Sequence, residues 1–278
     1  MNAMNEEQKT LWNGSAGRAW VDTQELLDRV FEPMEKLLVE AIPTGSACRV
    51  LDVGCGTGGT TVAAARRLGS GGQALGVDIS EPMIDRARAR AEQASSVASF
   101  VCADAQHHAF GAGSFDVILS RFGVMFFDDT AQAMSNLRRA ASSGAELRLL
   151  AWRSPEDNPF MTTAERAAAP LLPSLPERRP DAAGQFAFAD AERVRGILER
   201  SGWLDIDVRP VDMVCAFPES ELTVYLTRLG PLSRVLSDVE EPARARIIET
   251  VRDAFQPYVH GSEVRFSAAC WLFGARAP

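Results

Sequence analysis

Between residues 48 and 152, short apolar runs alternate with longer stretches in which apolar positions recur every three or four residues. The short runs predict strands at residues 48–53, 73–78, 98–103, 115–120 and 145–152. The periodic stretches predict helices at residues 57–68, 81–94, where Ser80 is the expected N-cap, and 130–141. Strands and helices in this alternation form right-handed βαβ units around a mostly parallel sheet.

The pattern changes in the second half of the chain. Prolines between positions 155 and 180 break any long helix, but the apolar residues between them give this stretch surface to bury. A helix at 191–201 and a strand at 206–215 follow. A second helical insertion at 219–257 then precedes a last strand at 265–275.

Charge and composition exclude several classes of function. Acidic residues outnumber basic ones by 37 to 29, so the surface repels phosphate backbones and a nucleic-acid partner is not expected. The chain has no apolar run of membrane-spanning length and begins with a polar segment, which predicts a cytoplasmic protein without membrane insertion. Its five cysteines are widely spaced and form no CxxC pair, so neither disulfides nor a metal site is expected.

A glycine turn follows the first predicted strand. Residues 54–59 satisfy the GxGxxG pattern of nicotinamide and flavin enzymes, and Asp78 lies where such enzymes place an acid for the ribose. Asp52 argues against that interpretation, because a carboxylate beside the turn would repel a pyrophosphate. S-adenosylmethionine has no phosphate and carries positive charge at its sulfonium and ammonium groups. The turn therefore favours a methyl donor over NAD.

Residues 50–58, Val-Leu-Asp-Val-Gly-Cys-Gly-Thr-Gly, resemble the first motif of class I S-adenosylmethionine-dependent methyltransferases. Residues 76–80, 102–105 and 114–120 resemble the second, third and fourth motifs, and they occur in family order. The flanking segments are similar, less specifically, to the small-molecule methyltransferases that include the ubiquinone and menaquinone C-methyltransferases.

The resemblance implies a doubly wound α/β fold with a mostly parallel, seven-stranded, Rossmann-like sheet, an antiparallel last strand and a helical lid. The chain then divides into a helical cofactor cover at 1–45, a cofactor-binding core at 46–152, lid insertions at 153–190 and 216–262, and the rest of the sheet domain at 191–215 and 263–278.

By position, the resemblance also implies how the methionine portion of S-adenosylmethionine is held. Its chain lies against the backbone of the glycine turn, which consists of Gly54, Cys55, Gly56, Thr57 and Gly58. Asp52 orients the ammonium group. Ser120, at the end of the fourth strand, adds a contact. Trp20, and after it Trp12, either closes over the cofactor or packs in the core of an N-terminal helix.

The adenosine portion is assigned in the same way. Asp78 accepts hydrogen bonds from both ribose hydroxyls, and Ile79 and Met83 lie against the faces of the adenine. Asp104 accepts from the adenine amino group, while the backbone of Ala105 contacts the ring edge.

Methyl transfer from a sulfonium is an in-line displacement that needs alignment and exclusion of water more than a strong acid or base. Arg121, at a strand end, either binds an acidic group of the acceptor or the cofactor carboxylate, or forms a salt bridge with Asp128 or Asp129. Of the available histidines, His107, His108 and His260, we choose His260 as the candidate base, because the loop before the last strand tends to face the acceptor.

The sequence thus predicts methyl transfer to an oxygen or carbon of a small, largely apolar acceptor that both insertions enclose. A non-catalytic cofactor-binding module, an NAD-dependent oxidoreductase and an aminopropyltransferase are the alternatives. The oligomeric state is left open. The apolar residues expected to form the lid core, or in a few cases to line the pocket, are Phe160, Leu171, Leu172, Phe186, Phe188, Phe217, Tyr225 and Leu229.

Overall fold

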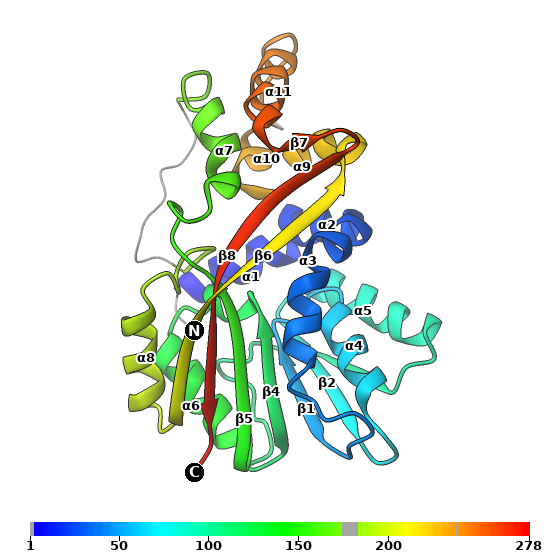
Figure 1. Ribbon diagram of the computed structural model, residues 1–278, viewed down its shortest axis with the longest axis vertical. Helices are drawn as coiled ribbons and strands as arrows, with labels where there is room; N and C mark the ends of the chain where they lie inside the picture. Colours follow the sequence, from blue (N-terminus) through cyan, green and yellow to red (C-terminus); the bar gives the residue numbers. More distant parts are fainter. Residues whose placement is uncertain (1–2, 174–182, 237) are drawn as a thin grey trace.

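A computed structural model describes residues 3–173, 183–236 and 238–278 (Figure 1), so part of the first predicted insertion, 174–182, lies outside the described residues. The strands are β1 Arg49–Val53, β2 Gln73–Asp78, β3 Ala98–Cys102, β4 Phe115–Arg121, β5 Ala141–Trp152, β6 Leu204–Pro218, β7 Val259–His260 and β8 Glu263–Arg276. The α-helices are α1 Ala3–Asn13, α2 Ser15–Asp22, α3 Gln24–Val39, α4 Gly59–Arg67, α5 Glu81–Gln93, α6 Thr130–Ala140, α7 Pro159–Ala168, α8 Ala191–Arg200, α9 Leu222–Arg228, α10 Gly230–Leu236 and α11 Ala243–Ala254. Short 3-10 turns span Gly123–Phe126, Glu219–Glu221 and Gln256–Tyr258.

The strands form one twisted sheet in the order β3-β2-β1-β4-β5-β8-β6, and the two-residue β7 pairs with β8. β1 pairs in parallel with β2 and β4, whereas β8 is antiparallel to both β5 and β6. The predicted α/β fold with an antiparallel last strand is therefore confirmed. Because the parallel strands all end at the same edge, that edge gathers Asp52, Asp78 and Arg121.

β6 and β8 are longer than the sequence pattern predicts, because they continue past the sheet as a two-stranded ribbon. Their pairing runs from Leu204 opposite Arg276 to Pro218 opposite Glu263. Figure 1 shows this ribbon bending away from the sheet and ending beside α9 and β7. It carries the second insertion beyond the edge at which the parallel strands end.

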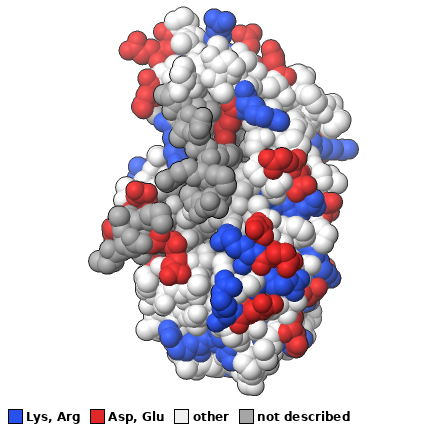
Figure 2. All heavy atoms as spheres, turned by 90° about the vertical axis from the view of Figure 1, so that its left-hand side faces the viewer, with Lys and Arg blue, Asp and Glu red and all other residues white. Residues whose placement is uncertain are grey.

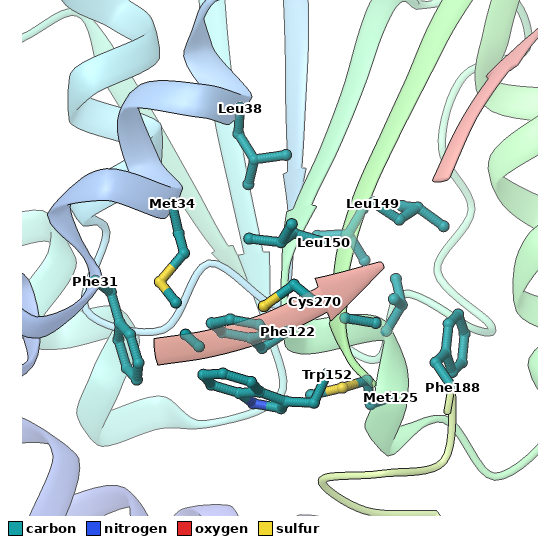
Figure 3. Close-up of a cluster of buried hydrophobic side chains, with 14 of the residues drawn as sticks. Phe31, Met34, Leu38, Phe122, Met125, Leu149, Leu150, Trp152, Phe188 and Cys270 are labelled. Carbon is teal, nitrogen blue, oxygen red and sulfur yellow. The ribbon is translucent and has the colours of Figure 1, made fainter. Parts of the chain in front are cut away.

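Helices cover both faces of the sheet. On one side α3 packs against α4, and α5 packs against β3, while on the other side α6 contacts β5 and α8 contacts β6. α3 buries one side of its surface, where Leu27, Val30, Phe31, Met34 and Leu38 recur at helical spacing. Figure 3 shows Phe31 and Met34 pointing from α3 toward Phe122 and Trp152, at the ends of two neighbouring strands.

Four helices, α7, α9, α10 and α11, stand above the carboxyl edge of the sheet, and we call them the lid helices. Their core is aromatic: Phe160 stacks on Phe266 with ring centroids 3.8 Å apart and meets Phe255 edge-on at 5.1 Å. Leu172 and Phe217 are also buried, whereas the buried Phe188 meets Phe273 of β8 edge-on against the sheet, with ring centroids 6.0 Å apart. In the described part of the chain, no helix is long and apolar enough to cross a membrane.

Candidate active site

The glycine turn joins β1 to α4 and brings the backbone close to two neighbours. Gly54 has φ +67, and a Cβ atom there would lie 2.5 Å from the Cα of Gly123, which follows β4. Gly56 has φ +54, yet only the Met83 Sδ lies within 4 Å of where its Cβ would be, at 3.8 Å. Gly54 is therefore required for packing, whereas Gly56 leaves an open cradle in front of the turn.

Asp52 is the penultimate residue of β1 and lies directly behind this cradle. It is 1% exposed, and its Oδ2 accepts a hydrogen bond from the Thr61 hydroxyl at 2.7 Å. Burial raises the pKa of Asp52 to about 6, although the Thr61 bond and the charge of Arg121 act in the other direction. A cationic ligand stabilises the ionised form of a buried carboxylate, so Asp52 is suited to bind an ammonium group.

Asp78, at the end of β2, holds the glycine turn in place. One carboxylate oxygen accepts from the Gly56 amide at 2.8 Å and the other from the Ser80 amide at 2.9 Å. Burial raises the pKa of Asp78, while these backbone bonds lower it. Each oxygen retains capacity for a further donor, so the expected contact with ribose hydroxyls is compatible with both bonds.

Ser80 occupies the N-cap position of α5, but it does not cap the helix with its side chain, so that expectation is corrected. The Ser80 hydroxyl instead donates to the Trp12 carbonyl at 2.6 Å. Asn13 supplies the cap: its Oδ1 accepts from the Glu81 amide at 2.9 Å and its Nδ2 donates to the Ile79 carbonyl at 3.0 Å. These bonds fasten the N-terminal helices to the loop that follows Asp78.

One cavity of about 780 Å³ opens between the carboxyl edge of the sheet and the lid helices. Its sheet end is lined by Gly54, Gly56, Asp78, Ile79, Met83, Asp104 and Ala105, as the sequence predicted for a cofactor site. Its lid end is lined by α7 and by residues 225–234. The N-terminal helices supply Trp12 and Trp20 as a side wall. Both insertions therefore face the same space as the glycine turn.

A second, much smaller cavity of about 30 Å³ lies behind the turn. It is lined by Asp52, Cys55, Gly56, Thr57, Trp20 and Arg121, among others. Burial raises the pKa of Cys55, so this thiol behaves as a small buried group. This space adjoins the part of the turn expected to hold the methionine chain.

Three of the predicted site residues lie away from these cavities. The Ser120 hydroxyl is fully buried, where it donates to the Val53 carbonyl at 2.7 Å and accepts from the Val124 amide. Gly58 has φ +83, and a Cβ there would lie 2.8 Å from that of Ala87, so it serves the packing of α5. Both residues shape the turn from outside the cavities.

His260 is the third, and its assignment as a catalytic base is corrected. β7 and β8 form a tight hairpin in which His260 pairs with Glu263, and this places the imidazole on the exposed tip of the ribbon. The ribbon carries it past the cavity, because β8 begins earlier than the sequence pattern indicates. His107 and His108 do not line the cavity either.

Arg121, at the end of β4, lines both cavities. Its guanidinium lies over the Phe31 ring, 5.4 Å from the centroid, and its Nη1 is 4.0 Å from Glu35 Oε2. The acid nearest to its guanidinium is thus on α3, and the alternative salt bridge with Asp128 or Asp129 does not form. Burial lowers the pKa of Arg121, and the charges of Glu35 and Asp52 oppose that shift.

Two aromatic residues at the strand ends were missed from the sequence pattern. Phe122 follows β4 with φ +67, a strained value for a residue with a side chain, and stacks on Trp152 with ring centroids 4.3 Å apart. Both residues line the large cavity between its two ends. Their position at the ends of β4 and β5, where such folds bind ligands, is the signal that could have singled them out.

The surface charges agree with the composition. On the face in Figure 2, basic and acidic side chains are interleaved rather than gathered into a basic stripe. Among the described residues, no group of histidine, cysteine or acidic side chains could hold a metal ion.

Known proteins are similar to this chain in both sequence and fold. A methyltransferase domain family matches residues 50–144. Aklanonic acid methyltransferase DauC of Streptomyces sp. is 34% identical over 55% of this chain and 71% of its own length. Nocamycin O-methyltransferase of Saccharothrix syringae is 27% identical over 80% of this chain and 83% of its own. The crystal structure of the YcgJ protein from Bacillus subtilis has a TM-score of 0.55 at 17% identity, covering 89% of this chain and 97% of that one.

The fold, the glycine turn and these relatives place the chain in one family. It belongs to the class I S-adenosylmethionine-dependent methyltransferases. The methyl-donor interpretation of the turn is thereby confirmed over the nicotinamide one. The finer resemblance to quinone C-methyltransferases stays a prediction.

Proposed function

We propose that this enzyme transfers the methyl group of S-adenosylmethionine to an oxygen of a small, largely apolar acceptor bound at the lid end of the cavity. The observation that carries the proposal is the large cavity, which joins the expected cofactor residues at the sheet end to the side chains of both insertions. An acceptor in this space would lie beside the cofactor, enclosed by the lid helices.

The lid end suits an apolar molecule. Its lining includes Phe160, Met161, Tyr225, Leu226, Leu229 and Leu232. Phe122 and Trp152 stand between the two ends and offer flat apolar surfaces to a ring system. Enclosure supports the reaction, since it fixes the approach of the acceptor and keeps water from the sulfonium.

We further propose that Gly54, Gly56, Asp52 and Trp20 hold the methionine portion of the cofactor. Asp78, Ile79, Met83, Asp104 and Ala105 would hold its adenosine. When bound, the cofactor supplies an activated methyl group with a neutral leaving group. The chain itself contributes position: the Asp78 carboxylate fixes the turn, and Asn13 fastens the N-terminal helices over it.

Oxygen is favoured as the methylated atom on two grounds. A relative that matches 80% of this chain is named an O-methyltransferase. In addition, none of the three histidines of this chain lines the cavity, so the structure offers no imidazole base. An acceptor oxygen that ionises readily by itself, as in an enol, a phenol or a carboxylic acid, needs no such base.

Transfer of a carbon-13 methyl group would test the proposal. The enzyme is incubated with labelled S-adenosylmethionine and a small-molecule extract, and the product is examined by NMR, in which methyl on oxygen and methyl on carbon differ in chemical shift. We expect an oxygen-bound methyl group. A label found on carbon or nitrogen would contradict the oxygen assignment.

The expected cytoplasmic location stays a prediction, and the oligomeric state stays open.

A further inference from the structure

The Arg121 guanidinium is buried without its full set of partners. Its side chain is 13% exposed, and among the described residues Nη1 has no hydrogen-bond partner. The closest acid, Glu35, reaches only to 4.0 Å, beyond hydrogen-bond range. A buried charge with an unused donor is costly unless a ligand completes it.

The position of Arg121 indicates what kind of ligand that is. It lines the small cavity behind the glycine turn together with Asp52, whose carboxylate is the only acid at the end of β1. These two buried side chains carry opposite charges, and each alters the pKa of the other by its charge. An amino acid bears its ammonium and its carboxylate on one carbon atom. The residues that bind those groups must therefore lie close together and carry opposite charges.

We propose that Arg121 binds the carboxylate of the methionine portion of the cofactor, opposite Asp52, which binds its ammonium group. This inference rests on the proposed cofactor site. A guanidinium suits the role because it is permanently charged and donates two parallel hydrogen bonds to a carboxylate. Phe31 and Glu35, both on α3, hold its side chain in place, so the N-terminal cover helps to position it.

The test compares two ligands on the intact enzyme: S-adenosylhomocysteine and its decarboxylated analogue, which keeps the amine. Calorimetry on the wild type should show tighter binding of S-adenosylhomocysteine by roughly tenfold or more, the usual value of hydrogen bonds to a charged group. In Arg121→Gln that preference should disappear, while affinity for the analogue changes little. Arg121→Lys keeps the charge but loses the pair of parallel N–H donors, so it should retain part of the preference for S-adenosylhomocysteine.

Arg88→Gln is the matched control, because it removes the same charge from an exposed arginine that pairs with Asp85. It should leave the preference unchanged. If Arg121→Gln keeps the wild-type preference, the proposal is overturned, and a raised KM for an acidic acceptor would then assign the arginine to the acceptor instead. Equal loss of affinity for both ligands would also overturn it, because that result indicates a purely structural role. If Arg121→Gln does not fold, the Arg121→Lys comparison decides.

The result can be separated from the fate of the proposed function. A wild-type enzyme that prefers the carboxylate-bearing ligand but methylates no oxygen would contradict the function and support this assignment. An enzyme that methylates oxygen without any such preference would support the function and contradict the assignment of Arg121.

Discussion

The two ends of the cavity are built in different ways. At the sheet end, the turn, Asp52 and Asp78 come from two consecutive βαβ units, and the backbone fixes them through the Gly56 amide bond to Asp78. At the lid end, the lining comes from segments far apart in the chain, held by side-chain packing such as that of Phe160 on Phe266. On the proposed assignment, the cofactor would thus be bound by local backbone geometry and the acceptor by side chains that long-range packing positions.

The largest effect should come from filling the cradle of the turn. We expect Gly56→Val to weaken S-adenosylhomocysteine binding by more than roughly 150-fold, since a β-branched side chain would resist φ +54 and enter the cavity. Gly45→Val is the control, because Gly45 has φ +76 with nothing within 4 Å and lies outside the cavity. Calorimetry should show the loss only at Gly56. Comparable losses in both variants would mean that backbone strain, not the cradle, governs binding.

Removal of the acid at the end of β2 should have the next largest effect. Asp78→Ala should weaken binding by roughly tenfold to 150-fold, because it removes charged hydrogen bonds to the ribose and releases the Gly56 amide. The affinity of Asp78→Ala for 5′-methylthioadenosine, which has the same ribose but no amino acid, should fall by a similar factor. Asp85→Ala, an exposed acid of α5, serves as the control. Unchanged affinity in folded Asp78→Ala would place the ribose elsewhere.

The sequence predicts these two ends with different success. The motifs predict that Asp52, Asp78 and the glycine turn meet at one edge of the sheet, and the structure brings them together there, because each lies in or next to the strand that positions it. Arg90 shows what the sequence does not predict. Its place in an arginine-rich helix indicates a solvated side chain, yet it donates hydrogen bonds to Asp28 at 2.8 Å and to the Thr57 carbonyl at 3.1 Å. Its partner Asp28 is 62 positions away, and no local pattern contains that information.

The prediction of His260 as the catalytic base was wrong for a similar reason. Its location depends on how far β6 and β8 pair beyond the sheet, which is decided by long-range packing such as that of β6 on α3 and of Phe266 on Phe160. Phe122 was missed because its role follows from a strained backbone and a stack on Trp152, and neither is visible in sequence alone.

Cofactor binding should depend on pH through Asp52. The pKa of Asp52 is about 6, so the carboxyl becomes neutral below that pH and no longer attracts the ammonium group. Between pH 7 and pH 5, affinity for S-adenosylhomocysteine should fall about tenfold. Asp52→Asn should bind weakly at both pH values, with this dependence removed. Arg121, Asp78 and Glu35 also face Asp52, so a dependence that survives in Asp52→Asn would assign the titration to Asp78 or Glu35.

A change at the lid end should affect the acceptor alone. Tyr225 lines the cavity and stacks on Phe217 with ring centroids 5.1 Å apart. Tyr225→Leu should raise the KM of the acceptor by several-fold, up to roughly tenfold, and leave the Kd of S-adenosylhomocysteine within about twofold. A change confined to the cofactor Kd would show that the two ends are not separate sites.

The smallest effect should come from His260. Because it lies on the exposed tip of the ribbon, His260→Ala should leave kcat and KM within about twofold of wild type. A loss of kcat of about tenfold or more would return the histidine to the active site.

Following a labelled methyl group tests directly whether the enzyme methylates a small, apolar acceptor. The enzyme is incubated with methyl-labelled S-adenosylmethionine and a whole-cell extract, which is then separated into small molecules, protein and nucleic acid. We expect the label to enter an apolar small molecule, and we expect Asp78→Ala to reduce this transfer at limiting cofactor. Label that enters protein or nucleic acid, with none in the small-molecule fraction, would contradict it.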